Sequence, residues 1–463
     1  MTSGPAQDEV RRLLGLIDQL DPLIRSVNAV NSHALAEAET LDRETAAGHR
    51  RSPLHGRAVL VKDNIDTAGL ASTAGSLALA DAPPERDAAL VRRLRECGMV
   101  VLGKTNLSEW ANIRDEHSTS GWSAHGGLTR NPYGLNRTAW GSSSGSGAAV
   151  AAGLACFAVG TETNGSITAP AAACGLVGLK PTVGLVPTEG VVPISWSQDS
   201  PGPMALTVAD AAALLDAMAG TRTADQLGVD VRGRRIGVPR ELWGYSPAAD
   251  AVAERALSLL SAAGAVIVDG LALPALKDLD EQVGLTLMLV ELKVALPRYL
   301  AHRQATVKTL ADVIAFNRAQ ADHELRWFGQ GLLELAEETE GVGSQAYLES
   351  VDACTVAGLA ELDRTLGEHD LDSLIAPAMA PAPPIDLVNG DVGVDGSASD
   401  SSALAGSPIL TVPMGLAHGL PVAVSLWGAR GSDLTVLQLG AALESGRDTT
   451  TGPLPDPTFP EWV

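Results

Sequence analysis

The feature that most constrains the fold is a series of short apolar runs, separated by segments with helical periodicity. In the N-terminal half, the runs 57–62 and 99–102 enclose a segment in which Leu90, Val91 and Leu94 share one helical face. Further runs lie at 235–238, 265–268, 374–376, 409–412 and 422–426. Continuous apolar runs of this length are typical of strands buried on both faces. The alternation predicts an α/β fold whose sheet is covered by helices.

Helix start and stop signals place the intervening helices. Asp8 is expected to cap the first of two N-terminal helices within 8–50, and the second is expected near 34–47. Asp87 is expected to open the next helix, and Gly98 to close it. Two more helices are predicted, at 207–219, begun by Thr207, and at 247–263.

Composition narrows the classes of partner. The chain has 463 residues, with 55 acidic and 33 basic side chains and a formal net charge of −22. This balance opposes binding to nucleic acid or to an anionic membrane surface. No secretory signal and no apolar stretch of spanning length is seen. The four cysteines are far apart and are expected to be buried apolar groups, so the chain is predicted to be cytoplasmic, without a metal or cofactor.

Two motifs match known sequence patterns, but the secondary structure predicted around each one does not fit the pattern. Residues 98–105 fit the phosphate-binding pattern of nucleotide hydrolases, but the four residues inside it form a predicted buried strand, which cannot wrap a phosphate. Residues 141–145 fit the nucleophile elbow of α/β-hydrolases, but no apolar strand is expected before them. His418 is the only tempting late histidine for such a triad.

Metal chemistry has no support in the residue spacing. The pair His323–Glu324 lacks a second histidine at helical spacing, and no Cys/His cluster supplies three ligands. The loop 386–402 is interpreted as a surface excursion, because Asp391 and Asp395 lack the spacing of a calcium-binding loop.

Two blocks rich in glycine and serine remain, at 141–147 and 160–167. Taken alone, each would be interpreted as a flexible loop. They flank an alanine-rich segment that ends in the apolar residues 156–159, so both are expected beside a buried element. Glycine-rich loops in such a place shape the backbone for a site.

These blocks and several others resemble the amidase signature family. The matching segments, in chain order, are 54–65, 103–110, 141–181, 202–204 and 405–413. They are spread along the chain from residue 54 to residue 413. The resemblance implies one α/β/α domain over 1–463 around a large twisted, mixed and mostly parallel sheet. Its parts are N-terminal helices at about 8–50, a signature core at about 54–219 and a C-terminal α/β part at about 233–445.

The resemblance also implies a catalytic triad of Lys62, Ser142 and Ser166, in which Ser166 is the nucleophile and the Gly141–Ser142 peptide bond is cis. The serine spacing, 166 − 142 = 24, agrees with the family motif. The backbone N–H groups of Thr163, Asn164, Gly165 and Ser166 are the implied oxyanion hole.

The chemistry explains why these residue types are needed. An amide is a poor electrophile, so the serine hydroxyl must lose its proton as it attacks. Desolvation can lower the pKa of a lysine by several units, so a buried Lys62 could be neutral. Neutral Lys62 could then take a proton from Ser142 while Ser142 takes one from Ser166, and the reverse transfer would protonate the leaving amine.

Departures from the family pattern bear on the substrate. Thr168 stands where related enzymes often carry an arginine that pairs with a substrate carboxylate, which argues against a small anionic substrate. Thr168 is therefore the candidate substrate-binding residue. The other departures are Asn164 and Glu162. The motif variants around Glu162, Gln198 and Trp110 look most like the peptide amidase branch.

The sequence thus predicts a serine amidohydrolase acting on a neutral amide, typified by a C-terminal peptide amide. The alternatives are a glutaminase-type subunit of an amidotransferase, a tailoring amidase that acts on a secondary amide, and a catalytically inactive scaffold protein. The expected partner is a small-molecule or short peptide amide. Oligomeric state and the roles of loops 114–130 and 386–402 stay open.

Overall fold

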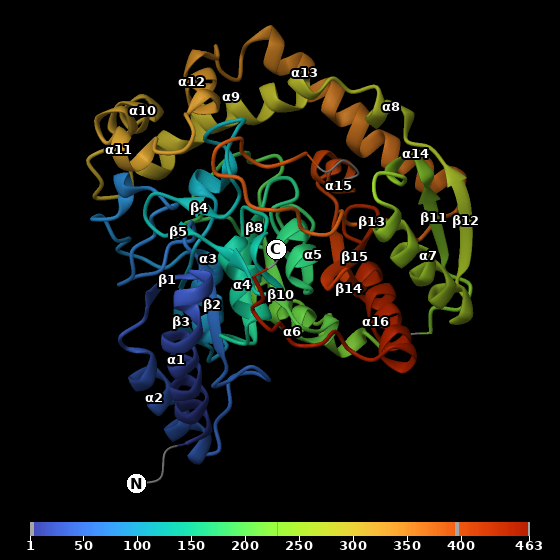
Figure 1. The fold of residues 1–463 in the computed structure, drawn as a ribbon, viewed down its shortest axis with the longest axis horizontal. Helices are drawn as coiled ribbons and strands as arrows, with labels where there is room; N and C mark the ends of the chain where they lie inside the picture. The colour runs from blue at the N-terminus through green and yellow to red at the C-terminus, as the bar shows by residue number, and fades with distance from the viewer. Residues whose placement is uncertain (1–3, 229, 394–397, 462–463) are drawn as a thin grey trace.

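A mixed sheet organises the molecule (Figure 1). The computed structural model describes residues 4–228, 230–393 and 398–461, and these form a sheet of 11 strands. Its strands, in spatial order, are β1 (Val27–Val30), β3 (Val100–Thr105), β2 (Ala58–Lys62), β8 (Phe157–Glu162), β10 (Ser200–Ala205), β9 (Val177–Lys180), β14 (Ile409–Ala417), β15 (Leu420–Trp427), β13 (Ser373–Pro377), β11 (Arg235–Pro239) and β12 (Val266–Leu271). The pairing of β9 with β14 joins the two halves of the chain in one sheet.

The predicted mixed sheet is confirmed, but its expected mostly parallel character is wrong. Parallel pairing is confined to β3–β2–β8 and to β13–β11–β12. The other neighbours in the described sheet pair antiparallel. The reason is visible in β14 and β15, which only two residues separate. A connection that short can join only antiparallel strands.

Some helices of the described residues cover the two faces of this sheet, and others form a belt beside it. They are α1 (Pro5–Ile24), α2 (Ala34–Ala46), α3 (Ala89–Glu96), α4 (Ser144–Ala151), α5 (Thr168–Cys174), α6 (Val208–Ala219), α7 (Pro247–Ala262), α8 (Pro274–Lys277), α9 (Glu281–Leu300), α10 (Leu310–Ala319), α11 (Ala321–Glu324), α12 (Gly331–Glu338), α13 (Gln345–Thr355), α14 (Glu361–Glu368), α15 (Ser399–Ala405) and α16 (Asp433–Thr450). One core contains side chains of α3, α6, α7 and α16, and the other contains side chains of α1, α2, α4 and α5.

Strand β2 shows how the sequence serves both cores. Val59 and Val61 belong to the first core, whereas Ala58 and Leu60 belong to the second. Successive side chains of a strand point to opposite faces, so an unbroken apolar run fits a strand that is covered twice. The predicted three-layer α/β/α architecture is confirmed.

A belt of helices from α9 to α14 runs as an arc along one side of the molecule (top of Figure 1). Leu292 and Leu296 of α9 pack in one cluster with Leu79 and Trp110, which lie in the loops after β2 and β3. The belt therefore covers the loops that follow β2 and β3.

Several element boundaries differ from the expected ones. Helix α1 begins at Pro5 rather than at Asp8, because proline has the φ angle of a first helical residue and needs no N–H partner. The N-terminal region also contains β1, a short strand at the edge of the sheet that the helical interpretation of 8–50 missed. Helix α3 begins at Ala89, and the Asp87 carboxylate accepts from Ala68 N–H instead of capping it. Thr207 caps α6 as predicted.

The division of the chain into one domain of three parts stays a prediction. Within the described residues, no helix combines the length and the apolar character needed to cross a bilayer.

Candidate active site

Lys62 is the last residue of β2, between β3 and β8. Its side chain is fully buried. Nζ lies 2.8 Å from Ser142 Oγ, 2.9 Å from Ser143 Oγ and 2.9 Å from Thr161 Oγ1. The Thr161 carbonyl oxygen is 3.1 Å away. Lys62 forms no ion pair with a carboxylate of the described residues. The amine is thus surrounded by hydroxyl and carbonyl oxygens.

This environment favours the neutral amine. Burial lowers the pKa of Lys62 well below its ordinary value, because an ammonium ion loses its hydration there. The negative charges of Glu162 and Asp199 act in the opposite direction and are smaller effects. A neutral lysine keeps a lone pair that can accept a proton from a hydroxyl group.

Ser142 is held against Lys62 by the turn before α4. The Gly141–Ser142 peptide bond is cis, as predicted. The Ser142 carbonyl oxygen accepts from Ser108 N–H at 3.1 Å. Gly145 lets the turn approach a neighbouring segment closely, because a Cβ there would lie 2.4 Å from the Ser26 carbonyl oxygen. The spacing of glycines thus fixes the path of the backbone at this serine.

Ser166 lies between β8 and α5 and is 9% exposed. Its carbonyl oxygen accepts from Ser143 N–H at 3.1 Å, so the two serine-rich turns are joined through the backbone. The described side chains contain no hydrogen bond between Ser166 Oγ and Ser142 Oγ. The structure therefore places Lys62 and Ser142 in direct contact and brings the Ser166 turn beside them.

Glu162 holds the turn that carries Ser166. Its Oε2 accepts from Ile167 N–H at 2.6 Å and from Thr168 N–H at 2.9 Å. The Thr168 hydroxyl donates to the same oxygen at 3.1 Å. Thr168, the candidate substrate-binding residue, therefore has its hydroxyl engaged by Glu162. It still lines a cleft of about 300 Å³ together with Gly141 and Gly165.

The expected oxyanion hole is the segment 163–166. Gly165 has φ 78°, a left-handed conformation that glycine adopts without strain. None of the four backbone N–H groups is hydrogen-bonded to another described residue. The Thr163 hydroxyl donates to Asp199 at 2.6 Å, which anchors the segment from the side. These N–H groups are therefore available to an oxygen of a bound ligand.

Both loops whose roles the sequence left open reach this region. Ser120 N–H, in loop 114–130, donates to the Asp391 carboxylate at 3.0 Å. In loop 386–402, the Asp400 carboxylate accepts from Asn164 Nδ2 at 2.6 Å, and Ser399 Oγ donates to Asn164 Oδ1 at 2.6 Å. The oxyanion segment is thus braced by helix α15, which the sequence reasoning did not assign.

Sequence reasoning also missed three residues around the amine. Ser143 and Thr161 contact Lys62, and Asn64 Nδ2 donates to Thr161 Oγ1 at 3.0 Å. All three lie within the motif segments 54–65 and 141–181. Only the fold shows which hydroxyl groups face the lysine.

The two rejected motifs behave as their surroundings indicated. Lys104, the lysine of the nucleotide-like pattern, belongs to β3 and is fully buried. The elbow-like serine Ser143 is buried and donates to the Thr161 carbonyl oxygen. Strand β7 (Gly134–Thr138) precedes the elbow-like motif, but its sequence Gly-Leu-Asn-Arg-Thr is not an apolar run and it lies in a separate two-stranded sheet, so the expectation of no apolar strand there holds. Among the residues described, no group of three His, Cys, Asp or Glu side chains could hold a metal ion.

Comparison with protein families gives a match over most of the chain. Residues 8–437 match the family described as Amidase. A probable amidase of Arabidopsis thaliana is 35% identical, over 94% of this chain and 85% of the plant protein. A glutamyl-tRNA(Gln) amidotransferase subunit of Moorella thermoacetica is 32% identical, over 94% of this chain and 92% of the bacterial protein.

Comparison with solved structures gives a higher identity. The peptide amidase PAM, in complex with the competitive inhibitor chymostatin, is 43% identical and superimposes with a TM-score of 0.91. The match covers 98% of this chain and 96% of the peptide amidase.

Proposed function

Because the chain belongs to the amidase family and is an amide-hydrolysing enzyme, we propose that it removes ammonia from the C-terminal carboxamide of short peptides, with Ser166 as nucleophile. The observation that carries this proposal is the fully buried Lys62 amine in contact with Ser142 Oγ at 2.8 Å. A buried amine without an ion-pair partner is suited to act as a base rather than as a structural cation.

The proposed reaction begins with proton transfer from Ser166 to Ser142 and from Ser142 to Lys62. As its proton leaves, Ser166 Oγ forms a bond to the carbonyl carbon of the amide. The lysine proton then returns through Ser142 to the nitrogen, the C–N bond breaks, and ammonia departs. Water attacks the resulting ester by the same relay, which releases the carboxylic acid and restores Ser166.

The oxyanion of each tetrahedral intermediate is proposed to bind the backbone N–H groups of Thr163, Asn164, Gly165 and Ser166. Preorganised donors of this kind stabilise the charge that develops on the carbonyl oxygen. Support comes from Gly165, whose positive φ turns the segment, and from the Asp400–Asn164 hydrogen bond, which fixes it.

A neutral substrate is proposed because the residues around Thr168 offer no fixed cation. The Thr168 hydroxyl is bound to the Glu162 carboxylate, so a substrate carboxylate there would meet a negative group. Burying an unpaired carboxylate costs several kcal/mol. The 43% identity with a peptide amidase supports a peptide-like acyl group.

The second candidate is the glutaminase role, which the 32% identity with an amidotransferase subunit favours. A glutaminase must accept the carboxylate and ammonium of glutamine beside its carboxamide. The third candidate is a tailoring amidase that acts on a secondary amide. Relative rates on matched substrates separate these candidates.

The test compares kcat/KM for a blocked dipeptide amide, free glutamine, malonamic acid and the N-methyl form of the dipeptide amide. We expect the dipeptide primary amide to be hydrolysed fastest, with loss of turnover in Ser166→Ala. Preference for glutamine or malonamic acid would overturn the peptide amide assignment in favour of an acidic substrate. Preference for the N-methyl amide would favour the secondary amide.

The proposal also includes that the enzyme needs no metal ion and that it is located in the cytoplasm. A lysine base makes a metal-bound hydroxide unnecessary, so dialysis against a chelator is expected to leave kcat/KM within about twofold of its starting value. Loss of activity that a divalent ion restores would contradict this. The four cysteines are free thiols, which supports the proposed cytoplasmic location.

A further inference from the structure

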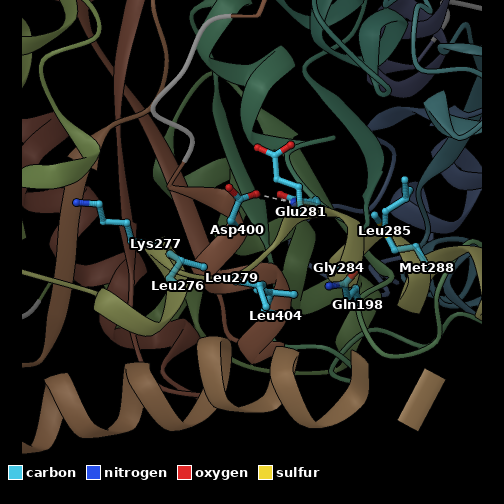
Figure 2. A pocket seen from close by; sticks show the side chains of 11 residues that line it. Gln198, Leu276, Lys277, Leu279, Glu281, Gly284, Leu285, Met288, Asp400 and Leu404 are labelled. Carbon is cyan, nitrogen blue, oxygen red and sulfur yellow. Dashed lines mark hydrogen bonds between the residues drawn. The ribbon is translucent and has the colours of Figure 1, made fainter. Parts of the chain in front are cut away.

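A second cleft lies on the other side of Asn164 from the one that contains Gly141 and Gly165. It has a volume of about 390 Å³ and is formed by α8, the start of α9, α15 and the turn at Gln198 (Figure 2). Asn164 and Asp400 line both clefts. Their hydrogen bond thus forms a shared wall, two residues before the proposed nucleophile Ser166.

Part of the wall of this cleft is aliphatic, and the rest is polar or charged. Leu276, Leu285, Met288 and Leu404 line it, and all four are half-buried. Apolar side chains left half-exposed in a concave site gain free energy when an apolar ligand covers them. The cleft is therefore suited to an apolar side chain.

Gln198 adds a polar group of defined direction. Its side chain is only 3% exposed, and its Oε1 has no hydrogen-bond partner among the described residues. Figure 2 shows it beside Leu404 at the lower edge of the cleft. A buried amide oxygen without a partner is costly. A peptide N–H group of a ligand would supply the missing donor.

The charged groups of the cleft oppose an anionic ligand. Asp400 and Glu281 line it, and in Figure 2 Lys277 points away from the other labelled side chains. Burial raises the pKa of Asp400, and the negative charge of Glu281 acts in the same direction. A third carboxylate in this place would meet like charges in a partly desolvated site.

We propose that this cleft is the subsite for the residue that precedes the amidated residue of the peptide, that it takes an apolar side chain, and that Gln198 accepts the peptide N–H. The inference rests on the proposed function and adds a specificity to it. Its substrate class is a peptide amide whose penultimate residue is aliphatic, with acidic residues excluded from that position.

Gly284 gives a direct way to fill the cleft. It lies in α9 and lines the cleft, and a Cβ added to it would meet no atom within 4 Å. The variant Gly284→Phe should therefore occupy the cleft without disturbing the helix. Gly15→Phe is the matched control, because Gly15 also lies in a 20-residue helix, is also half-buried and also faces open space.

The measurement is kcat/KM for leucyl-glycinamide, glycyl-glycinamide and glutamyl-glycinamide. We expect the wild-type enzyme to prefer the leucyl over the glycyl substrate by about tenfold or more, the ratio that burial of a leucine side chain allows. Gly284→Phe should abolish that preference and leave glycyl-glycinamide within about threefold of wild type. Gly15→Phe should change neither value.

Two further variants test the polar and charged groups. Gln198→Leu keeps the side-chain volume and should raise KM for leucyl-glycinamide with little change in kcat. Glu281→Gln should raise kcat/KM for glutamyl-glycinamide relative to the leucyl substrate. Thermal unfolding of each variant checks that it is folded.

The outcomes separate the two proposals. If wild type cleaves none of these amides, the proposed function fails. If wild type cleaves them but shows no leucyl preference, or keeps that preference in a folded Gly284→Phe variant, the subsite is wrong and the peptide amidase assignment stands.

Discussion

Two lysines on neighbouring parallel strands have the same burial and different surroundings. Lys62 ends β2 and Lys104 lies next to it in β3, where Val61 pairs with Lys104 and Lys62 with Thr105. Both side chains are fully buried. Lys104 Nζ is 3.8 Å from the Asp63 carboxylate, and it also donates to the Ile65 carbonyl oxygen and to Ser72 Oγ. Within the part of the chain that the structure describes, the Lys62 amine is hydrogen-bonded only to hydroxyl and carbonyl oxygens.

The difference teaches that burial alone does not make a lysine a base. Burial lowers the pKa of Lys104 to about 8, with Asp63 and Asp66 opposing it, so this lysine stays largely protonated at neutral pH. Burial lowers the pKa of Lys62 well below its ordinary value, and the oxygens nearest to its amine belong to hydroxyl and carbonyl groups, which carry no charge. Lys104 therefore stabilises a loop as a cation, whereas Lys62 is poised to take a proton.

The largest effect is expected for Ser166→Ala. It removes the proposed nucleophile, so turnover should fall by about 10⁴-fold or more, with an unchanged melting temperature. The check is steady-state kinetics together with thermal unfolding. A folded variant with near-normal turnover would mean that the base formed by Lys62 serves a different nucleophile.

The matched pair Lys62→Met and Lys104→Met tests the comparison itself. Lys62→Met should lower kcat by about 10³-fold, because the relay loses its base. Lys104→Met should leave Asp63 buried without its cation, a loss worth about 3–5 kcal/mol of stability. Its melting temperature should fall by several degrees, and the folded fraction should keep most of its kcat. The reverse pattern would exchange the two roles.

Lys62→Met should not be destabilised in the same way. Because its folded pKa is depressed, Lys62 lowers the free energy of unfolding as pH falls from the unfolded pKa, about 10.4, toward the folded pKa. Methionine removes this pH-dependent loss. A melting temperature at or above that of wild type at pH 7 is the expected result.

Two variants, Ser142→Ala and Ser143→Ala, separate the roles of the two serine hydroxyl groups that contact Lys62. Ser142 Oγ and Ser143 Oγ lie at nearly the same distance from Nζ, 2.8 Å and 2.9 Å. Only Ser142 has the proposed relay role, so Ser142→Ala should cost about 10²-fold or more in kcat and Ser143→Ala less than about tenfold. Equal losses would show that orientation of the amine, and not relay, is what the hydroxyl groups provide.

The sequence predicted the layers of the fold better than its strand directions. Unbroken apolar runs such as Ala58–Lys62 indicate burial on two faces, and this is why a sheet covered by helices could be predicted from them. The edge strand β1, Val27–Val30, is only four residues long, is interrupted by Asn28 and was missed. Strand direction depends on how the segments connect across the chain, which periodicity does not contain.

Local sequence pattern was also insufficient to predict the long-range contacts of the site. The resemblance to the amidase signature family predicted the cis bond at Ser142, which the structure confirms, whereas the triad roles of Lys62, Ser142 and Ser166 stay a prediction. The contact between Asn164 and Asp400 joins positions 236 residues apart, and no local pattern carries it. Thr168 looked like a substrate contact by position, whereas the fold gives its hydroxyl to Glu162.

The smallest and most specific effect is on the pH profile. The base must be neutral, so log kcat/KM should rise with slope one up to the pKa of Lys62 and then stay level. An ordinary lysine would place that plateau above about pH 10. Burial lowers the pKa of Lys62, so the plateau should begin far below that pH.

Asp199→Asn sharpens this test. The negative charge of Asp199 favours protonated Lys62, and burial raises its own pKa to about 6, so the charge is present above that pH. Asparagine removes the charge and should shift the acid limb of the profile to lower pH, while the plateau keeps its height within a few-fold. Among the described residues, Lys104 is hydrogen-bonded to Ile65, Thr67 and Ser72 and not to the proposed relay serines, so loss of its neighbour's charge in Asp63→Asn should leave the limb unmoved. An acid limb that shifts with Asp63→Asn and not with Asp199→Asn would identify Lys104 as the titrating base.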